Sequence, residues 1–138
     1  MLEELGKTKF PKVEIPITVK LYDVDAAGHV NNTVYVRWLE DMRTRLFTQF
    51  CSPKLLLKAN YYLVVVSCRM KYKKQIKLFQ EPIGRMTLVN YKHGVFTFEA
   101  IIKLEGKTVF HAVQECVLMN LKENKMYKNN VSKLVGSL

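Results

Sequence analysis

The chain has 138 residues, of which 49% are hydrophobic and 25% charged, and its formal net charge is +10. This length suits one domain, and this balance is typical of a globular protein, which excludes a largely disordered chain. The strongest apolar run, Tyr61 to Val66, is far shorter than the roughly 18 residues that cross a bilayer.

The first ten residues, MLEELGKTKF, carry two glutamates and no long apolar core. We therefore expect neither a secretory signal nor a transit peptide there, and a cytoplasmic location. The next segment, Lys12 to Tyr22, alternates strictly between apolar and polar residues, with Val13, Ile15, Ile17, Val19 and Leu21 on one face. A period of two predicts a half-buried strand, and Pro16 indicates that it lies at an edge of a sheet.

After a polar stretch, apolar residues recur at spacings of three and four, namely Tyr35, Trp38, Leu39, Met42, Leu46 and Phe50. This spacing predicts an amphipathic helix of about five turns. The side chain of Asn31 or Asn32 can cap its start by accepting a hydrogen bond from a free amide. The sequence CSPK at 51–54 ends the helix, and we expect one more short helical turn within Pro53–Asn60.

The remaining chain predicts four strands and a polar tail. Four segments are rich in β-branched and aromatic residues, namely Tyr61–Lys77, Gly84–Lys92, Val95–Glu105 and Lys107–Lys122. Tight turns in KHGV and EGK separate the last three. Strand, helix and four strands indicate an α+β fold, a sheet of about five strands around one long helix. We expect one domain over 1–138 with its core at about 13–122, and pairing of two chains to cover the sheet edges.

Three widely spaced cysteines, Cys51, Cys68 and Cys116, form no metal-binding spacing and predict reduced, mostly buried thiols. The excess of 22 Lys and Arg over 12 Asp and Glu predicts anionic partners. Three kinds of anionic partner are consistent with this positive charge: nucleic acid, an acidic carrier protein and a phosphate-bearing cofactor.

The run from Asp23 to Arg43 reads D-x-D-A-A-G-H-V-N-N-x-x-Y-x-x-W-x-E-x-x-R. It resembles the signature of the 4-hydroxybenzoyl-CoA thioesterase family, whose members have the hotdog fold. Asp25, Gly28, Val30, Asn32 and Tyr35 fall at the family spacing between a strand and a helix. The resemblance implies that Asp25 supplies the catalytic carboxylate and that the backbone amide of Asn32 polarises the thioester carbonyl. The His29 to Asn32 segment is more similar to the fatty-acyl and long-chain acyl carrier protein branches than to the aryl-CoA enzyme.

The chemistry is consistent with this implication. Thioester hydrolysis needs a group that attacks the carbonyl or activates water, and a carboxylate can do either. It also needs donors for the developing oxyanion, which the free amides at a helix N-terminus supply. A strand end, small residues and a helix start place both within one short loop.

Each candidate residue also has a structural interpretation. Asp25 alone would be read as a turn residue, but within the whole motif the catalytic role is favoured. Asp23 is expected to hold the loop through backbone amides. His29 either orients the loop or contacts substrate or water. Glu40 is an alternative catalytic carboxylate, because another hotdog branch uses a glutamate about two turns into the helix; its structural interpretation is an ion pair with Arg37 or Arg43.

The sequence thus predicts an acyl-CoA thioesterase with Asp25 as nucleophile or general base, assembled as a homodimer or homotetramer. No metal or redox cofactor, nucleic acid or membrane is implied. The expected substrate-binding residues are Gly28, Val30, Asn31, Tyr35, Lys73, Lys74 and Lys77, of which the lysines would hold CoA phosphates or an acidic carrier protein.

Other functions stay open at this point. One is an acyl carrier protein thioesterase, and another is a hotdog dehydratase, although no HFPG-like stretch is present. A nonenzymatic acyl-CoA sensor or RNA-binding module is also possible. RNA binding favours aromatic residues among the basic ones, and only Tyr72 lies within the basic run.

Overall fold

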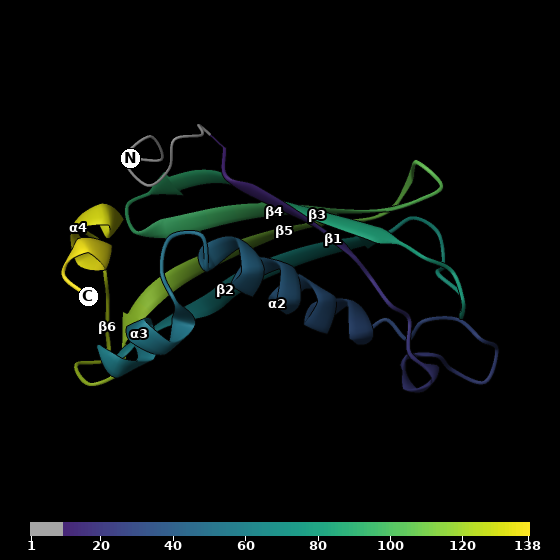
Figure 1. The fold of residues 1–138 in the computed structure, drawn as a ribbon, viewed down its shortest axis with the longest axis horizontal. Helices are drawn as coiled ribbons and strands as arrows, with labels where there is room; N and C mark the ends of the chain where they lie inside the picture. The colour runs from purple at the N-terminus through teal and green to yellow at the C-terminus, as the bar shows by residue number, and fades with distance from the viewer. Residues whose placement is uncertain (1–9) are drawn as a thin grey trace.

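The structure is a computed structural model that describes residues 10–138. Its antiparallel sheet has the strand order β1 (Lys12–Pro16), β3 (Ile83–Lys92), β4 (Val95–Leu104), β5 (Lys107–Asn120) and β2 (Tyr61–Tyr72), and β6 (Lys125–Met126) pairs with β5. The helix α2 (Val34–Phe47) lies along the inner side of this curved sheet (Figure 1). The predicted α+β hotdog fold is confirmed.

The hairpins have the turn chemistry that the sequence indicates. Both central residues of the β3–β4 turn, His93 and Gly94, have positive φ (53° and 82°), and so do Glu105 and Gly106 of the β4–β5 turn (50° and 78°). Two-residue turns of this kind match the twist of antiparallel strands. They set the register that turns Phe96, Phe98, Ala100 and Ile102 of β4 inward.

The core lies between α2 and the sheet. Leu39, Met42 and Leu46 of α2 are completely buried, as are Met86 and Leu88 of β3. Gly84 permits this close packing, because a Cβ at that position would lie 2.7 Å from the Sδ atom of Met42. The ends of the Met42 and Ile17 side chains would then have to shift to relieve the overlap.

Three elements end earlier in the structure than the sequence patterns predict. The first strand ends at Pro16, and the short 3₁₀ helix η1 (Leu21–Asp23) follows, so Leu21 is 73% exposed. Pro16 does lie on an edge strand, as predicted. Helix α2 has 14 residues and ends at Phe47, so it is about four turns long. Strand β2 ends at Tyr72, after which the chain leaves the sheet and buries Ile76 in the core.

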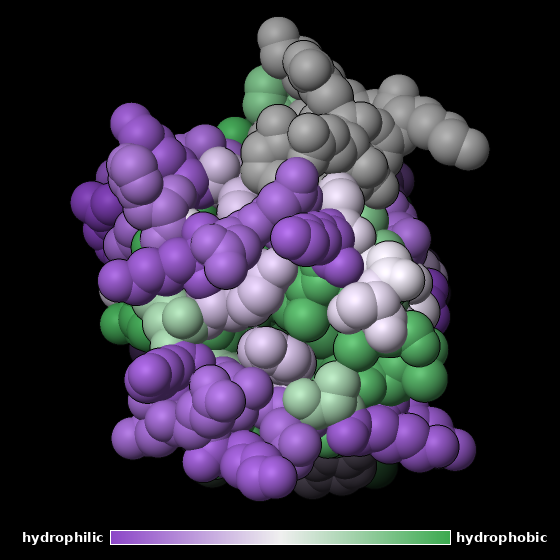
Figure 2. All heavy atoms as spheres, turned by 90° about the vertical axis from the view of Figure 1, so that its left-hand side faces the viewer, coloured by the Kyte–Doolittle hydropathy of each residue, from purple (hydrophilic) through white to green (hydrophobic). Residues whose placement is uncertain are grey.

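The short helix expected after α2 is confirmed as α3 (Pro53–Lys58), with Ser52 as N-cap accepting a hydrogen bond from the amide of Lys54. The polar tail adds β6 and α4 (Val131–Gly136). Val131 is completely buried and joins the same core. At this end of the molecule, apolar surface lies between hydrophilic residues (Figure 2).

Among the described helices, none is long and apolar enough to span a bilayer. The expectation that the chain starts without a signal sequence concerns residues 1–9, which lie outside the described residues. The cytoplasmic location stays a prediction.

Candidate active site

The loop between η1 and α2 is a tight turn closed by backbone pairing. Val24 and Val30 form an isolated antiparallel bridge, and the amide of Asp25 donates to the carbonyl of His29 at 2.9 Å. Gly28 sits in this turn with a φ of +80°, a conformation that favours glycine. The small and polar residues of the motif are therefore what this turn requires.

Asp25 presents a partly free carboxylate at the surface. Its Oδ1 accepts hydrogen bonds from the amides of Ala27 (2.9 Å) and His29 (3.1 Å). Within residues 10–138 no partner is recorded for Oδ2. One oxygen thus orients the carboxylate, and the other is available to a water or a carbonyl carbon.

Asp23 has the opposite environment and the structural role that was expected. It is 4% exposed, and its Oδ2 accepts a hydrogen bond from the amide of Lys20 at 2.8 Å. Its backbone carbonyl accepts the amide of Asn31 at 2.9 Å, which ties η1 to the start of α2.

The Asn32 amide lies at the start of α2. Asn31 Oδ1 accepts from the amide and hydroxyl of Thr33, and the Asn31 carbonyl accepts the amide of Val34. The N-cap is Thr33, so Asn31 supports the helix start from just outside it. For the Asn32 amide, no acceptor is recorded in the described part of the chain. A free N–H at a helix start is suited to an anion.

A second loop, which follows β2, lies against this turn. His29 and Lys77 form an isolated bridge, the Val30 amide donates to the Ile76 carbonyl at 2.8 Å, and the Leu78 amide donates to the Gly28 carbonyl at 3.1 Å. Lys77 is thereby placed beside His29. The His29 side chain itself makes no recorded hydrogen bond to residues 10–138, so the loop is held by its backbone.

Lys73 and Lys74 are exposed and connect β2 to the same second loop. Both of their amides donate to the carbonyl of Val109 in β5. The three lysines of the expected phosphate site thus belong to one loop that borders the candidate site, with Lys77 directly at it.

Val30 and Tyr35 lie beneath the surface, with 5% and 2% exposure. The Tyr35 ring packs against Trp38, Tyr72 and Phe110 at centroid distances of 5.0, 4.9 and 4.6 Å. Burial raises the pKa of the Tyr35 hydroxyl, so that group stays protonated at neutral pH. These two side chains form the floor under the loop.

Sequence reasoning missed one residue of this arrangement. The Tyr72 hydroxyl donates to the backbone carbonyl of Asn32 at 3.0 Å, although the two residues are 40 positions apart. No local pattern could predict this contact, because it depends on how β2 passes the start of α2.

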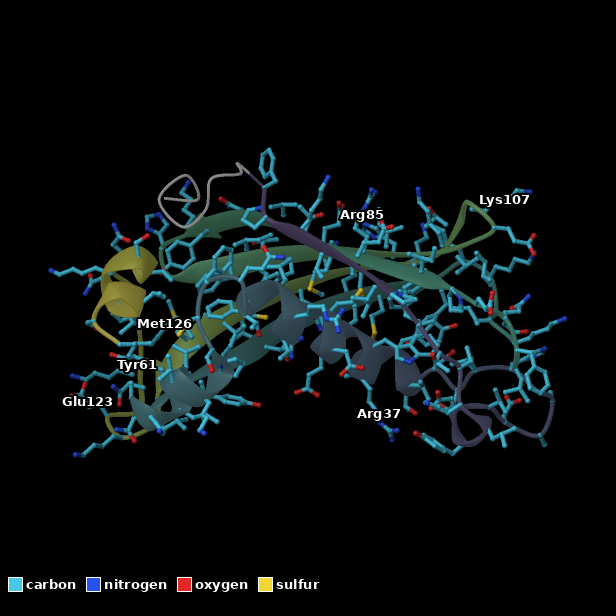
Figure 3. The ribbon with its side chains drawn as sticks, viewed as in Figure 1. Arg37, Tyr61, Arg85, Lys107, Glu123 and Met126 are labelled. Carbon is cyan, nitrogen blue, oxygen red and sulfur yellow. The ribbon has the colours of Figure 1, made fainter. Side chains whose placement is uncertain are left out.

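Glu40 lies on the exposed side of α2, eight residues beyond Asn32 and so about 12 Å farther along the helix. The expected ion pair with Arg37 or Arg43 is absent from the described residues. Arg43 is instead buried and donates to Gln114 Oε1 at 2.8 Å. Arg37 projects from α2 away from the sheet (Figure 3).

A cavity of about 320 Å³ opens beside the loop, and its walls include Lys20, Tyr22 and Asp23 from one side and Trp38 and Arg37 from α2. Asp25, His29 and Asn32 do not line it. The Asp25 carboxylate, the His29 ring and the Asn32 amide therefore lie outside this cavity.

Comparisons with known proteins agree with this architecture. A model of the thioesterase-like superfamily matches residues 19–131. The long-chain acyl-CoA thioesterase FadM of Escherichia coli (strain K12) is 26% identical over 115 residues, covering 82% of this chain and 87% of FadM.

Two solved structures share the fold. A Staphylococcus aureus protein in complex with CoA has a TM-score of 0.80 at 14% identity, covering 90% of this chain and 80% of that one. A gentisyl-coenzyme A thioesterase has a TM-score of 0.79 at 18% identity, covering 89% and 98%. The chain belongs to the thioesterase-like superfamily. It is a thioester hydrolase with the hotdog fold.

Proposed function

We propose that this protein hydrolyses an acyl-CoA thioester to the free acid and CoA. The observation that carries the proposal is the pairing of a half-free carboxylate with a free amide in one loop, Asp25 Oδ2 and the Asn32 N–H. The matching family model, a relative that is a long-chain acyl-CoA thioesterase, and a similar fold in complex with CoA support it.

In the proposed reaction, Asp25 either attacks the thioester carbonyl or accepts a proton from the attacking water. Negative charge then develops on the carbonyl oxygen, and the Asn32 amide with the α2 N-terminus stabilises it. Collapse of this intermediate breaks the C–S bond and expels the CoA thiolate. If Asp25 is the nucleophile, the product is an acyl-Asp25 anhydride, which a water then hydrolyses to the free acid and the regenerated carboxylate. If water attacks, the free acid forms directly, and the proton taken by Asp25 passes to the thiolate. Gly28 and Asn31 form the surface on which the thioester would lie, above the buried Val30 and Tyr35, and His29 borders it.

The proposed assembly is a homodimer, alone or as half of a homotetramer, formed through the free edge of β2. Tyr62, Val65 and Val66 on this strand are 46%, 38% and 56% exposed. Antiparallel pairing of two copies about a two-fold axis would set the first half of one β2 against the second half of the other. Each Tyr72 end, and the candidate site beside it, would then border the partner, so the pantetheine arm would enter between subunits.

The phosphates of CoA are proposed to lie on Lys73, Lys74 and Lys77, which are exposed on the loop beside the site. The same exposed lysines also favour an acyl carrier protein as thioester carrier, because such proteins are acidic. Measuring kcat/KM for the CoA thioester and for the carrier-protein thioester of the same acyl group would show which of the two is the preferred substrate.

The experiment that tests the function measures thiol release from a panel of acyl-CoA thioesters. Asp25→Asn should lose most of the turnover on the best substrate, since an amide neither attacks well nor accepts a proton. Asp41→Asn, an equal charge change at an exposed position on α2, is the control and should keep it. Circular dichroism checks that the variants are folded.

The same assay decides between the two carboxylates. Glu40→Gln should reduce turnover far less than Asp25→Asn, because Glu40 lies two turns away from the free Asn32 amide. The reverse ranking would make Glu40 the catalytic carboxylate, and near-normal turnover of Asp25→Asn would remove Asp25 from the mechanism.

A further inference from the structure

Tyr72 is the last residue of β2, and its side chain reaches the loop that opens α2. Its hydroxyl donates to the Asn32 carbonyl at 3.0 Å. The ring makes edge-to-face contacts with Tyr35 (4.9 Å, 89°) and Phe110 (5.2 Å, 60°). Both neighbours are buried, so the hydroxyl is presented from a rigid aromatic cluster.

This hydrogen bond completes the anchoring of Asn32. The peptide before its Cα contains the Asn31 carbonyl, which accepts the amide of Val34 at 2.9 Å, and also the free Asn32 N–H. The peptide after its Cα contains the Asn32 carbonyl, held by Tyr72, and the Thr33 N–H, held by Asn31 Oδ1. Both peptide planes that flank Asn32 therefore have fixed orientations.

An anchored amide is what oxyanion stabilisation needs. A donor acts on the transition state to the extent that it already points at the developing charge and need not reorient. Without Tyr72, the second peptide would be held only by the exposed side chain of Asn31. Rotation about the backbone bonds of Asn32 would then let the neighbouring amides point in a wider range of directions.

We propose that Tyr72 is a positioning residue for thioester hydrolysis, which holds the Asn32 segment so that its free amide faces the substrate carbonyl. This inference rests on the proposed function. It assigns a task to a strand residue that is distant from the motif in sequence. Burial also raises the pKa of the Tyr72 hydroxyl, which keeps it a protonated donor at neutral pH.

The test is Tyr72→Phe, which removes the hydroxyl and keeps the ring contacts. We expect kcat to fall roughly tenfold, less than the 10²–10³ for loss of a direct oxyanion donor, while KM changes less than twofold. The matched control is Tyr91→Phe, since the Tyr91 hydroxyl also donates to a backbone carbonyl, that of Asn129, at 2.9 Å. The control should keep kcat.

A second measurement does not depend on activity. In ¹⁵N-labelled protein, the amide signals of Asn31 to Val34 should broaden or shift in Tyr72→Phe and stay in place in Tyr91→Phe. Unchanged kcat or unchanged signals in Tyr72→Phe would overturn the positioning role. An equal loss of kcat in both variants would also overturn it, because it would show a general structural effect.

Failure of the proposed function has a different signature. The wild-type protein would then release no thiol from any acyl-CoA, while the amide signals would still report whether Tyr72 orders the segment. Wild-type turnover together with an unaffected Tyr72→Phe variant contradicts the positioning role alone.

Discussion

Asp23 and Asp25 carry the same side chain two positions apart and have opposite surroundings. Asp23 ends η1 and is buried, whereas Asp25 begins the turn and is exposed. The change of backbone conformation between them turns one carboxylate into the fold and the other outward. Each carboxylate has one oxygen without a recorded partner in residues 10–138, but only that of Asp25 belongs to an exposed side chain in the turn before α2.

The three cysteines also differ by surroundings. Cys51 and Cys116 are buried free thiols, as expected, but Cys68 on the edge strand β2 is exposed. Burial raises the pKa of Cys116 from the ordinary value of 9.0 to about 11, and the nearby Arg43 offsets only part of this rise.

The raised pKa of Cys116 predicts a loss of stability in alkali. Between about pH 9 and 11 the unfolded chain releases the thiol proton and the folded chain keeps it, so the free energy of unfolding falls as pH rises. A shift of about two units corresponds to about 3 kcal/mol. Urea unfolding of wild type and Cys116→Ala at pH 8 and 11 measures it. The variant, although less stable at pH 8, should lose less stability across this range.

If both proteins lost the same free energy of unfolding between the two pH values, the thiol would not be the titrating group. Buried tyrosines such as Tyr35 act in the same direction and remain in both proteins, so they cancel in this comparison.

At the scale of elements, β2 is the exception in the sheet. Strand β4 buries every second residue along most of its length, and β3 and β5 also bury many of theirs, but most of β2 is exposed. It lies at the free edge of the sheet, and its pairing with β5 is interrupted at Val66. An edge with exposed apolar residues invites a second strand unless something covers it.

The proposed β2 interface predicts that Val66→Lys separates the subunits. Lysines brought together across a two-fold axis repel each other and lose apolar contact. Light scattering after size exclusion should give a multiple of 16.1 kDa for wild type and a mass near 16.1 kDa for the variant. Leu121→Lys, at an equally exposed position (56%) outside the strands, is the control.

Activity should follow the mass, because the proposed pantetheine entrance lies between subunits. A wild-type protein that is a fully active monomer would contradict both the interface and this entrance. A dimer that survives Val66→Lys would place the contact on another surface.

At the scale of the molecule, the dominant property is the net charge of +10. Positive charge attracts CoA from a distance, and salt screens this attraction over about 10 Å at 0.1 M. Salt weakens both a general attraction by net charge and binding at a specific phosphate site. The two are therefore distinguished by neutralising lysines at different positions on the surface.

The proposed phosphate site predicts that Lys73, Lys74 and Lys77 act locally. Replacing all three by Gln should raise KM for an acyl-CoA at low salt and flatten its salt dependence, with little change in kcat. Replacing Lys103, Lys107 and Lys125, which are also exposed, lowers the net charge by the same three units and should affect KM less. An N-acetylcysteamine thioester, which lacks phosphates, should respond to neither change.

Equal effects of the two triple variants would indicate general steering by net charge. An unchanged KM and salt response in the first variant would show that CoA phosphates bind elsewhere.

Much of this architecture could be predicted from local patterns. The periods of two and 3.6, the Gly-containing turns and the polar run from Asp23 to Asn32 indicated the strands, the helix and the loop between them, because each depends on residues close in sequence. Element ends were harder. The apolar pattern of α2 continues to Phe50, but Thr48 caps the helix and Phe50 reaches the core from a turn instead.

The sequence alone determined that Asp25 and Asn32 share one short loop between a strand and a long helix, because backbone geometry over about ten residues dictates it. Only the tertiary structure decided what lies against that loop. Strand β2 and the residues after it bring Tyr72 to the Asn32 carbonyl and Lys77 to His29, across 40 and 48 positions. Such contacts depend on sheet order and register, which arise from packing of the whole core rather than from any local pattern.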